Sequence, residues 1–371
     1  MDWKVRFVDY PSQFQNMKES IMGTLETVLS RGDLMLRQQL RDFETHLAAF
    51  VGTRYAVGTS NCTDALMLSL RAVGIGAGDE VISVSHTFVA TIAAIHHTGA
   101  IPVLVDIGDD HNMNVALIEP AITRRTKAIV PVHLNGRVCD MKQLMTIAKQ
   151  HGLLVIEDSA QALGASCDGV RGGALGDAGC FSFYPAKLLG AYGDAGAVVT
   201  NREDVAEKVR RLRDHGRTPE GEIDGWSFNC RLDNLQAALL DLKLAQLPES
   251  LGRRRELAGR YDAALSALRQ VRLPPPPKED GRYYDVYQNY EVCAQDRDRL
   301  VAHLKANGIE TLIPWGGKGV HQFKALGLSH FNLPVTDLFF QEALMLPLHP
   351  ELTNDQVDYV VATIHGFYAR A

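Results

Sequence analysis

The sequence predicts an α/β fold in which helices cover both faces of an open, mostly parallel sheet. Three observations lead to this prediction. Short apolar runs alternate with helical patterns through roughly the first 250 residues. The runs are nearly continuous in Val, Ile and Leu, as expected for strands that are buried on both faces. Each helical pattern lies between two such runs, which is the arrangement that connects parallel strands.

Each predicted strand is a short apolar run that ends at polar or turn-forming residues. In chain order the runs cover residues 55–59, 80–84, 101–106, 127–131 and 153–157, and a further run ends at residue 183. A helix is expected over residues 63–72, with Gly74 just beyond its end. Another is expected over residues 141–151, with Asp140 as its N-cap. The alternation of strand and helix is that of a β-α-β sheet.

The pattern changes beyond about residue 201, where apolar residues recur at helical spacing. Helices are predicted over residues 202–215 and 232–247, and the basic run at 253–255 is interpreted as the solvated face of a further helix. Four prolines at residues 274–277 form a stiff segment that no helix can contain. The remaining predicted elements are a strand over 287–293 and helices over 296–308 and 354–368.

This change in pattern predicts two domains. We expect a large α/β domain over residues 1–250 and a small α+β domain over residues 251–371. The length of 371 residues suits two domains, and the 46% of apolar residues can fill a large core.

Charge and targeting signals narrow the class of protein. The chain has 38 basic and 44 acidic residues, and this net charge of −6 argues against a nucleic-acid-binding protein. The sequence has no apolar run long enough to span a membrane and no signal peptide at its start, so a cytoplasmic protein is expected. The six cysteines form no C-x-x-C pair, and we expect no metal site.

Chemically useful side chains directly follow four of the predicted strands, at the edge of the sheet where ligands bind. They are Asp158, Lys187, the helix start at Thr63, and Phe88. Each residue alone is more often a cap, a solvated charge or a core ring. Together they are what pyridoxal phosphate needs: a lysine for the Schiff base, a carboxylate for the pyridine nitrogen, a helix N-terminus for the phosphate and an aromatic ring for stacking.

Around these residues the sequence resembles the DegT/DnrJ/EryC1/StrS family of pyridoxal-phosphate-dependent sugar aminotransferases. The resemblance implies fold type I, with a large domain and a small C-terminal domain, and it spans nearly the whole chain. It rests on ordered motifs at residues 155–165, 180–187 and 192–196, with further matches at 78–82, 87–91, 132–136, 214–216, 229–233 and 346–350.

The resemblance implies a role for each matched residue. Lys187 would form the Schiff base and later move the proton, and burial would lower its pKa enough for this. Asp158 would pair with the ring nitrogen, Gln161 would reach the ring hydroxyl, and Phe88 would stack on the ring.

The resemblance also implies ligands for the cofactor phosphate. These would be Cys62, Thr63, Ser182 and Asn229. The family takes the asparagine from the neighbouring subunit, so the resemblance implies a homodimer with shared active sites.

The substrate-facing motifs differ more from the family pattern than the cofactor motifs do. Asn135 occupies a common tyrosine position, and Trp315 stands in the segment before His321 that usually holds tyrosine and proline. Arg37 lies where the family has a glycine-rich substrate loop. Arg37, Trp315 and His321 are therefore the candidates for substrate contacts.

The resemblance implies transfer of an amino group, from L-glutamate, to a keto group of a nucleotide-linked deoxy sugar. One alternative is dehydration at C3 of a 4-keto sugar, but in the family histidine replaces the lysine in such enzymes, and this chain has Lys187. Another alternative is a regulatory protein that binds the cofactor without turnover. The position aminated, the sugar or cyclitol, and the nucleotide stay open.

Overall fold

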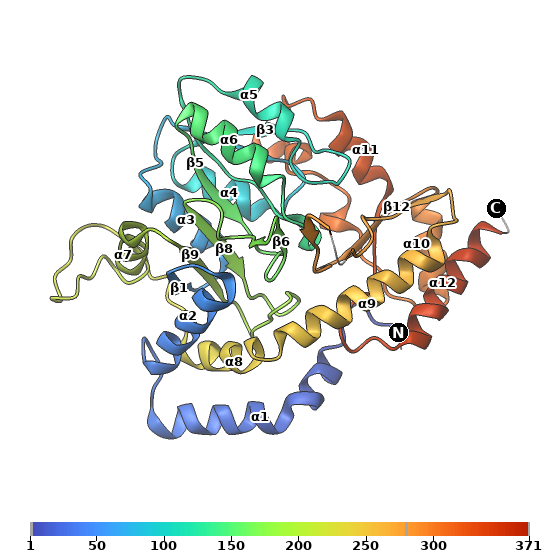
Figure 1. Cartoon of the computed structure of the whole chain (residues 1–371), viewed down its shortest axis with the longest axis horizontal. Helices are drawn as coiled ribbons and strands as arrows, with labels where there is room; N and C mark the ends of the chain where they lie inside the picture. Colours follow the sequence, from blue (N-terminus) through green and yellow to red (C-terminus); the bar gives the residue numbers. More distant parts are fainter. Residues whose placement is uncertain (1–2, 279–280, 370–371) are drawn as a thin grey trace.

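A seven-stranded sheet forms the centre of the larger part of the protein (Figure 1). The structure is a computed structural model that describes residues 3–278 and 281–369. The strand order is β1-β9-β8-β5-β4-β2-β3, and β9 runs antiparallel to both of its neighbours while the other pairs are parallel. The mostly parallel α/β sheet is thereby confirmed. The strands are β1 (Tyr55–Thr59), β2 (Glu80–Val84), β3 (Ile101–Val105), β4 (Thr126–Ile129), β5 (Leu154–Asp158), β8 (Ala178–Ser182) and β9 (Gly196–Thr200).

Helices cover both faces of this sheet because its strands alternate buried side chains between two apolar cores. Neighbouring residues of β2 show this, since Ile82 belongs to the core beneath α2, α6 and α8 and Val81 to the core beneath α3, α4 and α7. The helices are α1 (Tyr10–Arg31), α2 (Gln38–Val51), α3 (Cys62–Ala72), α4 (Val89–His97), α5 (Ile118–Ala121), α6 (Met141–His151), α7 (Glu203–Leu212) and α8 (Asn234–Leu244).

A smaller layer is built on a three-stranded sheet of order β10-β12-β13. Helices α9, α10 and α12 pack on it around a third apolar core. A short sheet of order β11-β6-β7 joins the two parts. The elements are β6 (Ser166–Cys167), β7 (Val170–Arg171), β10 (Val271–Arg272), β11 (Tyr283–Tyr284), β12 (Tyr290–Ala294), β13 (Ala343–Leu346), α9 (Leu247–Leu265), α10 (Arg297–Ala306), α11 (Pro334–Glu342) and α12 (Asn354–Tyr368).

Two features of the chain cross the boundary that was expected at residue 250. Helix α9 runs through it, with Leu251 in the first core and Tyr261 in the third (Figure 1). At the N-terminus, Val5 pairs with Ile309 and packs in the third core. The division into residues 1–250 and 251–371 therefore stays a prediction.

Two predicted elements are wrong in their limits. The helix expected over 232–247 is broken between Leu244 and Leu247, and α9 starts afresh with Pro248 in its first turn, where the missing N–H group is not needed. The strand expected from Tyr287 begins at Tyr290 instead, because Tyr287 has a left-handed backbone with φ of 49°.

The interpretation of residues 253–255 as a solvated face is wrong at Arg254. Its side chain is buried, and its guanidinium donates hydrogen bonds to the carbonyl oxygens of Tyr287 (3.1 Å), Gln288 (3.2 Å) and Leu348 (2.9 Å). Burial lowers the pKa of Arg254 to about 10, so the group is still charged at neutral pH. The cation therefore fastens α9 to the loops that flank β12 and β13.

Substituting methionine for Arg254 is expected to lower the free energy of unfolding by about 2 kcal/mol or more. The change keeps much of the apolar stem but leaves three buried carbonyl oxygens without their donor. Urea unfolding of the whole chain measures the loss. Arg260→Met is the control, since Arg260 lies on the same helix and pairs with Asp358 at the surface. An Arg254 variant as stable as this control would contradict the structural role.

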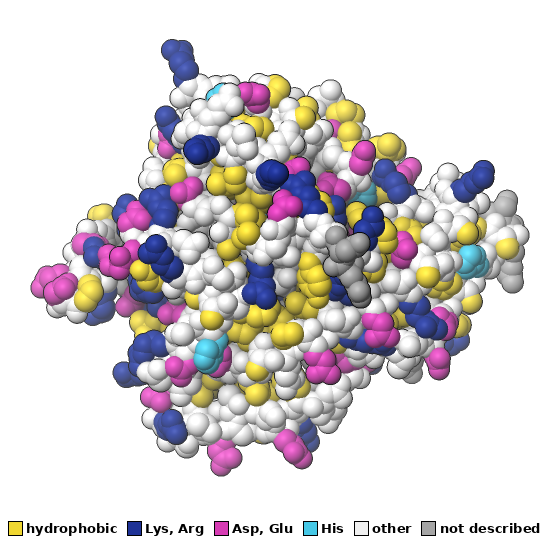
Figure 2. All heavy atoms as spheres, in the orientation of Figure 1, with side chains coloured by type: hydrophobic (Ala, Val, Ile, Leu, Met, Phe, Trp, Pro, Cys, Tyr) yellow, Lys and Arg dark blue, Asp and Glu magenta, His cyan; other side chains and the backbone are white. Residues whose placement is uncertain are grey.

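No helix among residues 3–278 and 281–369 is long and apolar enough to cross a membrane. Figure 2 shows basic and acidic side chains interspersed over one face of the molecule, with hydrophobic side chains gathered near its middle.

Candidate functional site

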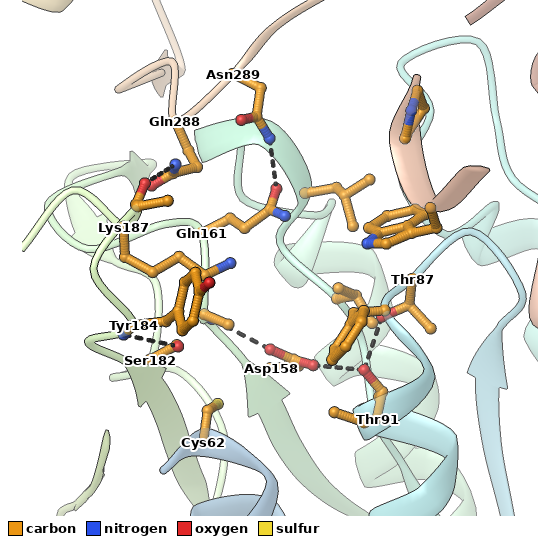
Figure 3. Close-up of a pocket in the computed structure, with 18 of the residues that line it drawn as sticks. Cys62, Thr87, Thr91, Asp158, Gln161, Ser182, Tyr184, Lys187, Gln288 and Asn289 are labelled. Atoms are coloured by element: carbon orange, nitrogen blue, oxygen red, sulfur yellow. Dashed lines mark hydrogen bonds between the residues drawn. The ribbon is translucent and has the colours of Figure 1, made fainter. Parts of the chain in front are cut away.

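A cavity of about 590 Å³ lies beyond the carboxyl ends of β5 and β8 and the N-terminus of α3 (Figure 3). This is the edge of the sheet at which the sequence predicts a ligand. Most of the predicted site residues meet there, and those that line the cavity are Cys62, Thr63, Phe88, Asp158, Gln161, Ser182, Lys187 and Trp315.

Lys187 lies in the tight turn that follows β8. Its backbone N–H donates to the carbonyl oxygen of Tyr184 at 2.8 Å, and its side chain extends into the cavity (Figure 3). The residues on either side of it are held by one amide: Gln288 accepts from the N–H of Leu188 and donates to the carbonyl oxygen of Ala186, each at 2.8 Å. Burial lowers the pKa of the Lys187 amine, while Asp158 and Cys62 oppose this shift.

Asp158 ends β5 and is almost completely buried. Its two carboxylate oxygens accept hydrogen bonds from the hydroxyl of Thr91 (2.6 Å) and the backbone N–H of Ala160 (3.1 Å). Because Thr91 gives its proton to Asp158, the hydroxyl of Thr87, 2.7 Å away, must donate to Thr91 (Figure 3). Burial raises the pKa of Asp158, and the hydrogen bonds and Lys187 act against that rise.

Thr91 and Gln288 were not predicted as site residues. Thr87 and Thr91 are four residues apart at the start of α4, and this spacing could have indicated a pair of hydroxyls on one face. Gln288 is 100 residues beyond Leu188, and no local pattern connects the two.

The N-terminus of α3 supplies backbone donors to the cavity. Asn61 is the N-cap and accepts from the N–H of Asp64 at 2.8 Å. Within the described part of the chain, the N–H groups of Cys62 and Thr63 have no backbone or side-chain acceptor. With the hydroxyl of Ser182 they form a donor set suited to a phosphate dianion.

Gly196 allows β9 to lie against this helix start. A Cβ atom at position 196 would be 2.4 Å from the carbonyl carbon of Asn61 and 2.7 Å from the nitrogen of Cys62. The turn could not keep its place beside any larger residue. The acid, the lysine and this donor set together fit pyridoxal phosphate.

Gln161 and Phe88 form two further walls of the cavity. The side-chain oxygen of Gln161 accepts from the backbone N–H of Asn135 at 2.8 Å and from the amide nitrogen of Asn289 at 3.3 Å. Phe88 precedes α4, and 57% of its surface is exposed, so its ring is available to a ligand.

Three predicted site residues lie outside the cavity of their own chain. His321 is buried elsewhere, where its ring bonds Ser85 (2.6 Å) and Asp337 (3.0 Å). Arg37 is exposed at the start of α2. Asn229 is exposed beside Asp214, with which its backbone is paired.

Burial raises the pKa of the Cys62 thiol well above its usual range, which keeps it protonated.

No group of three or more His, Cys, Asp or Glu residues among residues 3–278 and 281–369 is arranged to hold a metal ion.

Comparison with known proteins agrees with this geometry. The model of the DegT/DnrJ/EryC1/StrS aminotransferase family matches residues 15–365. A protein of Geobacillus stearothermophilus named as a pleiotropic regulatory protein is 40% identical over 367 residues, covering 98% of each chain. A dTDP-3-amino-3,4,6-trideoxy-alpha-D-glucose transaminase of Micromonospora megalomicea subsp. nigra is 39% identical over 368 residues, covering 96% of each chain. The X-ray structure of DesV from S. venezuelae, in complex with a ketimine intermediate, is similar with a TM-score of 0.95 and 38% identity over 99% of both chains.

Proposed function

Because the chain belongs to the DegT/DnrJ/EryC1/StrS aminotransferase family, we propose that its cavity transfers an amino group to the keto group of a nucleotide-linked sugar. The family depends on pyridoxal phosphate. The observation that carries the proposal is the meeting of Lys187 and Asp158 in one cavity beside the free N–H groups of α3.

When bound, pyridoxal phosphate supplies an electron sink that stabilises negative charge on the substrate carbon. Lys187 would hold the cofactor covalently and then, as a free amine, carry a proton between the substrate carbon and C4′ of the cofactor. The lowered pKa of Lys187 suits this role, because more of the amine is unprotonated near neutral pH. Asp158, oriented by Thr91 and Ala160, would keep the ring nitrogen protonated.

We further propose that the acceptor is a 3-keto deoxy sugar linked to a nucleotide, that L-glutamate is the donor, and that the enzyme acts in the cytoplasm. The placement of the keto group at C3 is suggested by the Micromonospora relative, which is named for a 3-amino sugar. The test is a single turnover of the protein loaded with pyridoxamine phosphate, with a panel of dTDP- and UDP-linked 3-keto and 4-keto sugars. Return of the visible absorbance of the lysine-bound cofactor with a 3-keto compound supports the proposal, and its return with 4-keto compounds alone contradicts it.

A regulatory role without turnover is the second candidate, because the Geobacillus relative is named as a regulatory protein. The same experiment separates the two. A protein that binds the cofactor but aminates no sugar of the panel, and accepts no amino group from L-glutamate, would favour regulation.

We also propose a homodimer in which Asn229 reaches the cofactor phosphate of the neighbouring subunit. Its exposed position outside its own cavity supports this arrangement. In a hybrid dimer, one subunit would carry Lys187→Ala and the other Asn229→Phe. If each active site combines Lys187 of one subunit with Asn229 of the other, both lesions fall in one site and the second site is intact. About half of the wild-type activity is then expected.

The parent homodimers, Lys187→Ala alone and Asn229→Phe alone, serve as controls for this hybrid. If Asn229 served its own subunit, each site of the hybrid would carry one lesion. A hybrid as inactive as both parents would therefore contradict the shared site.

A further inference from the structure

A chain of hydrogen-bonded amides leads from the small layer to Gln161. It begins at Glu291 in β12, which is 1% exposed. The side-chain nitrogen of Asn135 donates to Oε1 of Glu291 at 2.6 Å. The nitrogen of Asn289 donates to Oδ1 of Asn135 at 2.8 Å. It also donates to Oε1 of Gln161 at 3.3 Å (Figure 3).

Donor and acceptor chemistry fixes the direction of each amide in this chain. The carboxylate of Glu291 accepts, so Asn135 must turn its nitrogen toward Glu291 and its oxygen toward Asn289. The oxygen of Asn135 is an acceptor, so Asn289 must present its nitrogen to it. That nitrogen and the backbone N–H of Asn135, which is 2.8 Å from Gln161, are both donors, so Gln161 must present its oxygen to them. The nitrogen of Gln161 is then the end that is left for the cavity.

The backbone of Asn135 contributes to this arrangement as well. Its φ of 54° is left-handed, a conformation that asparagine tolerates better than most residues. The bond to Glu291 anchors this turn from the other side. If that bond were lost, both donors to Gln161 would be loosened, because one is the backbone of Asn135 and the other depends on its side chain.

We propose that Glu291 is a positioning residue: through Asn135 and Asn289 it fixes the amide of Gln161 so that its nitrogen donates to the ring oxygen of pyridoxal phosphate. This inference rests on the proposed function, because the ring oxygen is the acceptor that the cofactor would place there. Glu291 itself does not line the cavity, and among the described residues the small layer contributes no charged group to its wall.

The test compares the binding of two compounds to the apoprotein by calorimetry. Pyridoxine 5′-phosphate has the ring oxygen, and 3-deoxypyridoxine 5′-phosphate lacks it; neither has the aldehyde that reacts with Lys187. Wild type is expected to prefer the first by about tenfold or more, as one hydrogen bond to a charged oxygen allows. In Glu291→Met the preference is expected to fall to about threefold or less, with little change for the deoxy compound.

Glu291→Gln is the matched variant, because its amide oxygen can still accept from Asn135. The added nitrogen would replace Oε2, which has no hydrogen-bond partner within the described residues, so the exchange breaks no hydrogen bond. It removes the negative charge that faces the rings of His86 and His111, each 3.8 Å from Oε1, and so separates the effect of the charge from that of the bond to Asn135. This variant should keep a preference close to that of wild type. Val292→Ala, a buried change in the same strand, controls for loosening of β12. If Glu291→Met does not fold, Asn135→Gly removes the same link with a residue that suits the left-handed backbone.

A Glu291→Met variant that keeps the wild-type preference would overturn the role of Glu291. A variant that binds both compounds more weakly by the same factor would also overturn it, because that result would indicate general loosening of β12. Wild-type protein that binds both compounds equally would overturn the donation by Gln161. Wild-type protein that binds neither compound would instead overturn the proposed function itself.

Discussion

Lys187→Ala is expected to lower the rate of transamination by several orders of magnitude. The variant loses two things at once: the covalent anchor of the cofactor and the amine that moves the proton. The cavity would keep Asp158 and the N-terminus of α3, so cofactor should still bind without a covalent bond. Mass spectrometry after borohydride reduction measures the first loss, because wild type would gain one phosphopyridoxyl group and the variant none. Turnover with L-glutamate measures the second.

Lys208→Ala is the control, since Lys208 lies on α7 and contacts the carbonyl oxygen of Ala72 instead of the cavity. Its activity is expected to equal that of wild type. Near-normal transamination by Lys187→Ala would remove the basis of the assigned mechanism, and another lysine would have to be sought.

Asp158→Asn is expected to lower kcat by at least ~100-fold, or about 2.7 kcal/mol. Asparagine keeps the shape and can still accept from Thr91, but it has no charge to keep the ring nitrogen of the cofactor protonated. The electron sink is weakened in the transition state, while contacts to the phosphate are left in place. Steady-state kinetics at saturating substrate measures the change, and calorimetry shows whether cofactor still binds.

Asp177→Asn provides a matched comparison at the opposite end of β5, where Asp177 accepts from the N–H of Val155 at 2.9 Å. Asp177→Asn is compared with wild type and Asp158→Asn at equal cofactor occupancy, and it is expected to keep the kcat of wild type. If Asp158→Asn retained a few tenths of wild-type activity, a different group would have to be the partner of the ring nitrogen.

Six of the seven strands of the large sheet could be predicted because they are short apolar runs, a local property of the sequence. Lys187 and Asp158 could be predicted for the same reason, since each directly follows such a run at the ligand-binding edge. The antiparallel strand β9 was not predicted. Family resemblance added roles for residues such as Gln161 that composition and spacing do not distinguish.

The supporting contacts could not be predicted, because they join residues far apart in sequence. Gln288 is hydrogen-bonded to Leu188 in the lysine turn, 100 positions earlier in the sequence. Glu291 accepts a hydrogen bond from Asn135, 156 positions earlier. The sequence pattern predicts Arg254 to be one of three surface arginines. Its burial depends on three carbonyl oxygens from distant loops, which accept its hydrogen bonds. His321 is buried outside the cavity, where Ser85 and Asp337 hold its ring, and Arg37 is exposed outside the cavity of its own chain.

The pairing of the N-terminal segment with the small layer affects how the protein is completed during synthesis. The N–H of Phe7 donates to Glu310, 303 positions later, and Phe7 forms part of the cavity wall. A ribosome that adds about 5–20 residues per second makes Phe7 wait roughly 15–60 s for this partner. The strands that carry Asp158 and lead into Lys187 are made well before then. In a nascent chain the strands that lead to Asp158 and Lys187 are therefore present before the segments that hold the lysine turn and complete the opposite wall of the cavity.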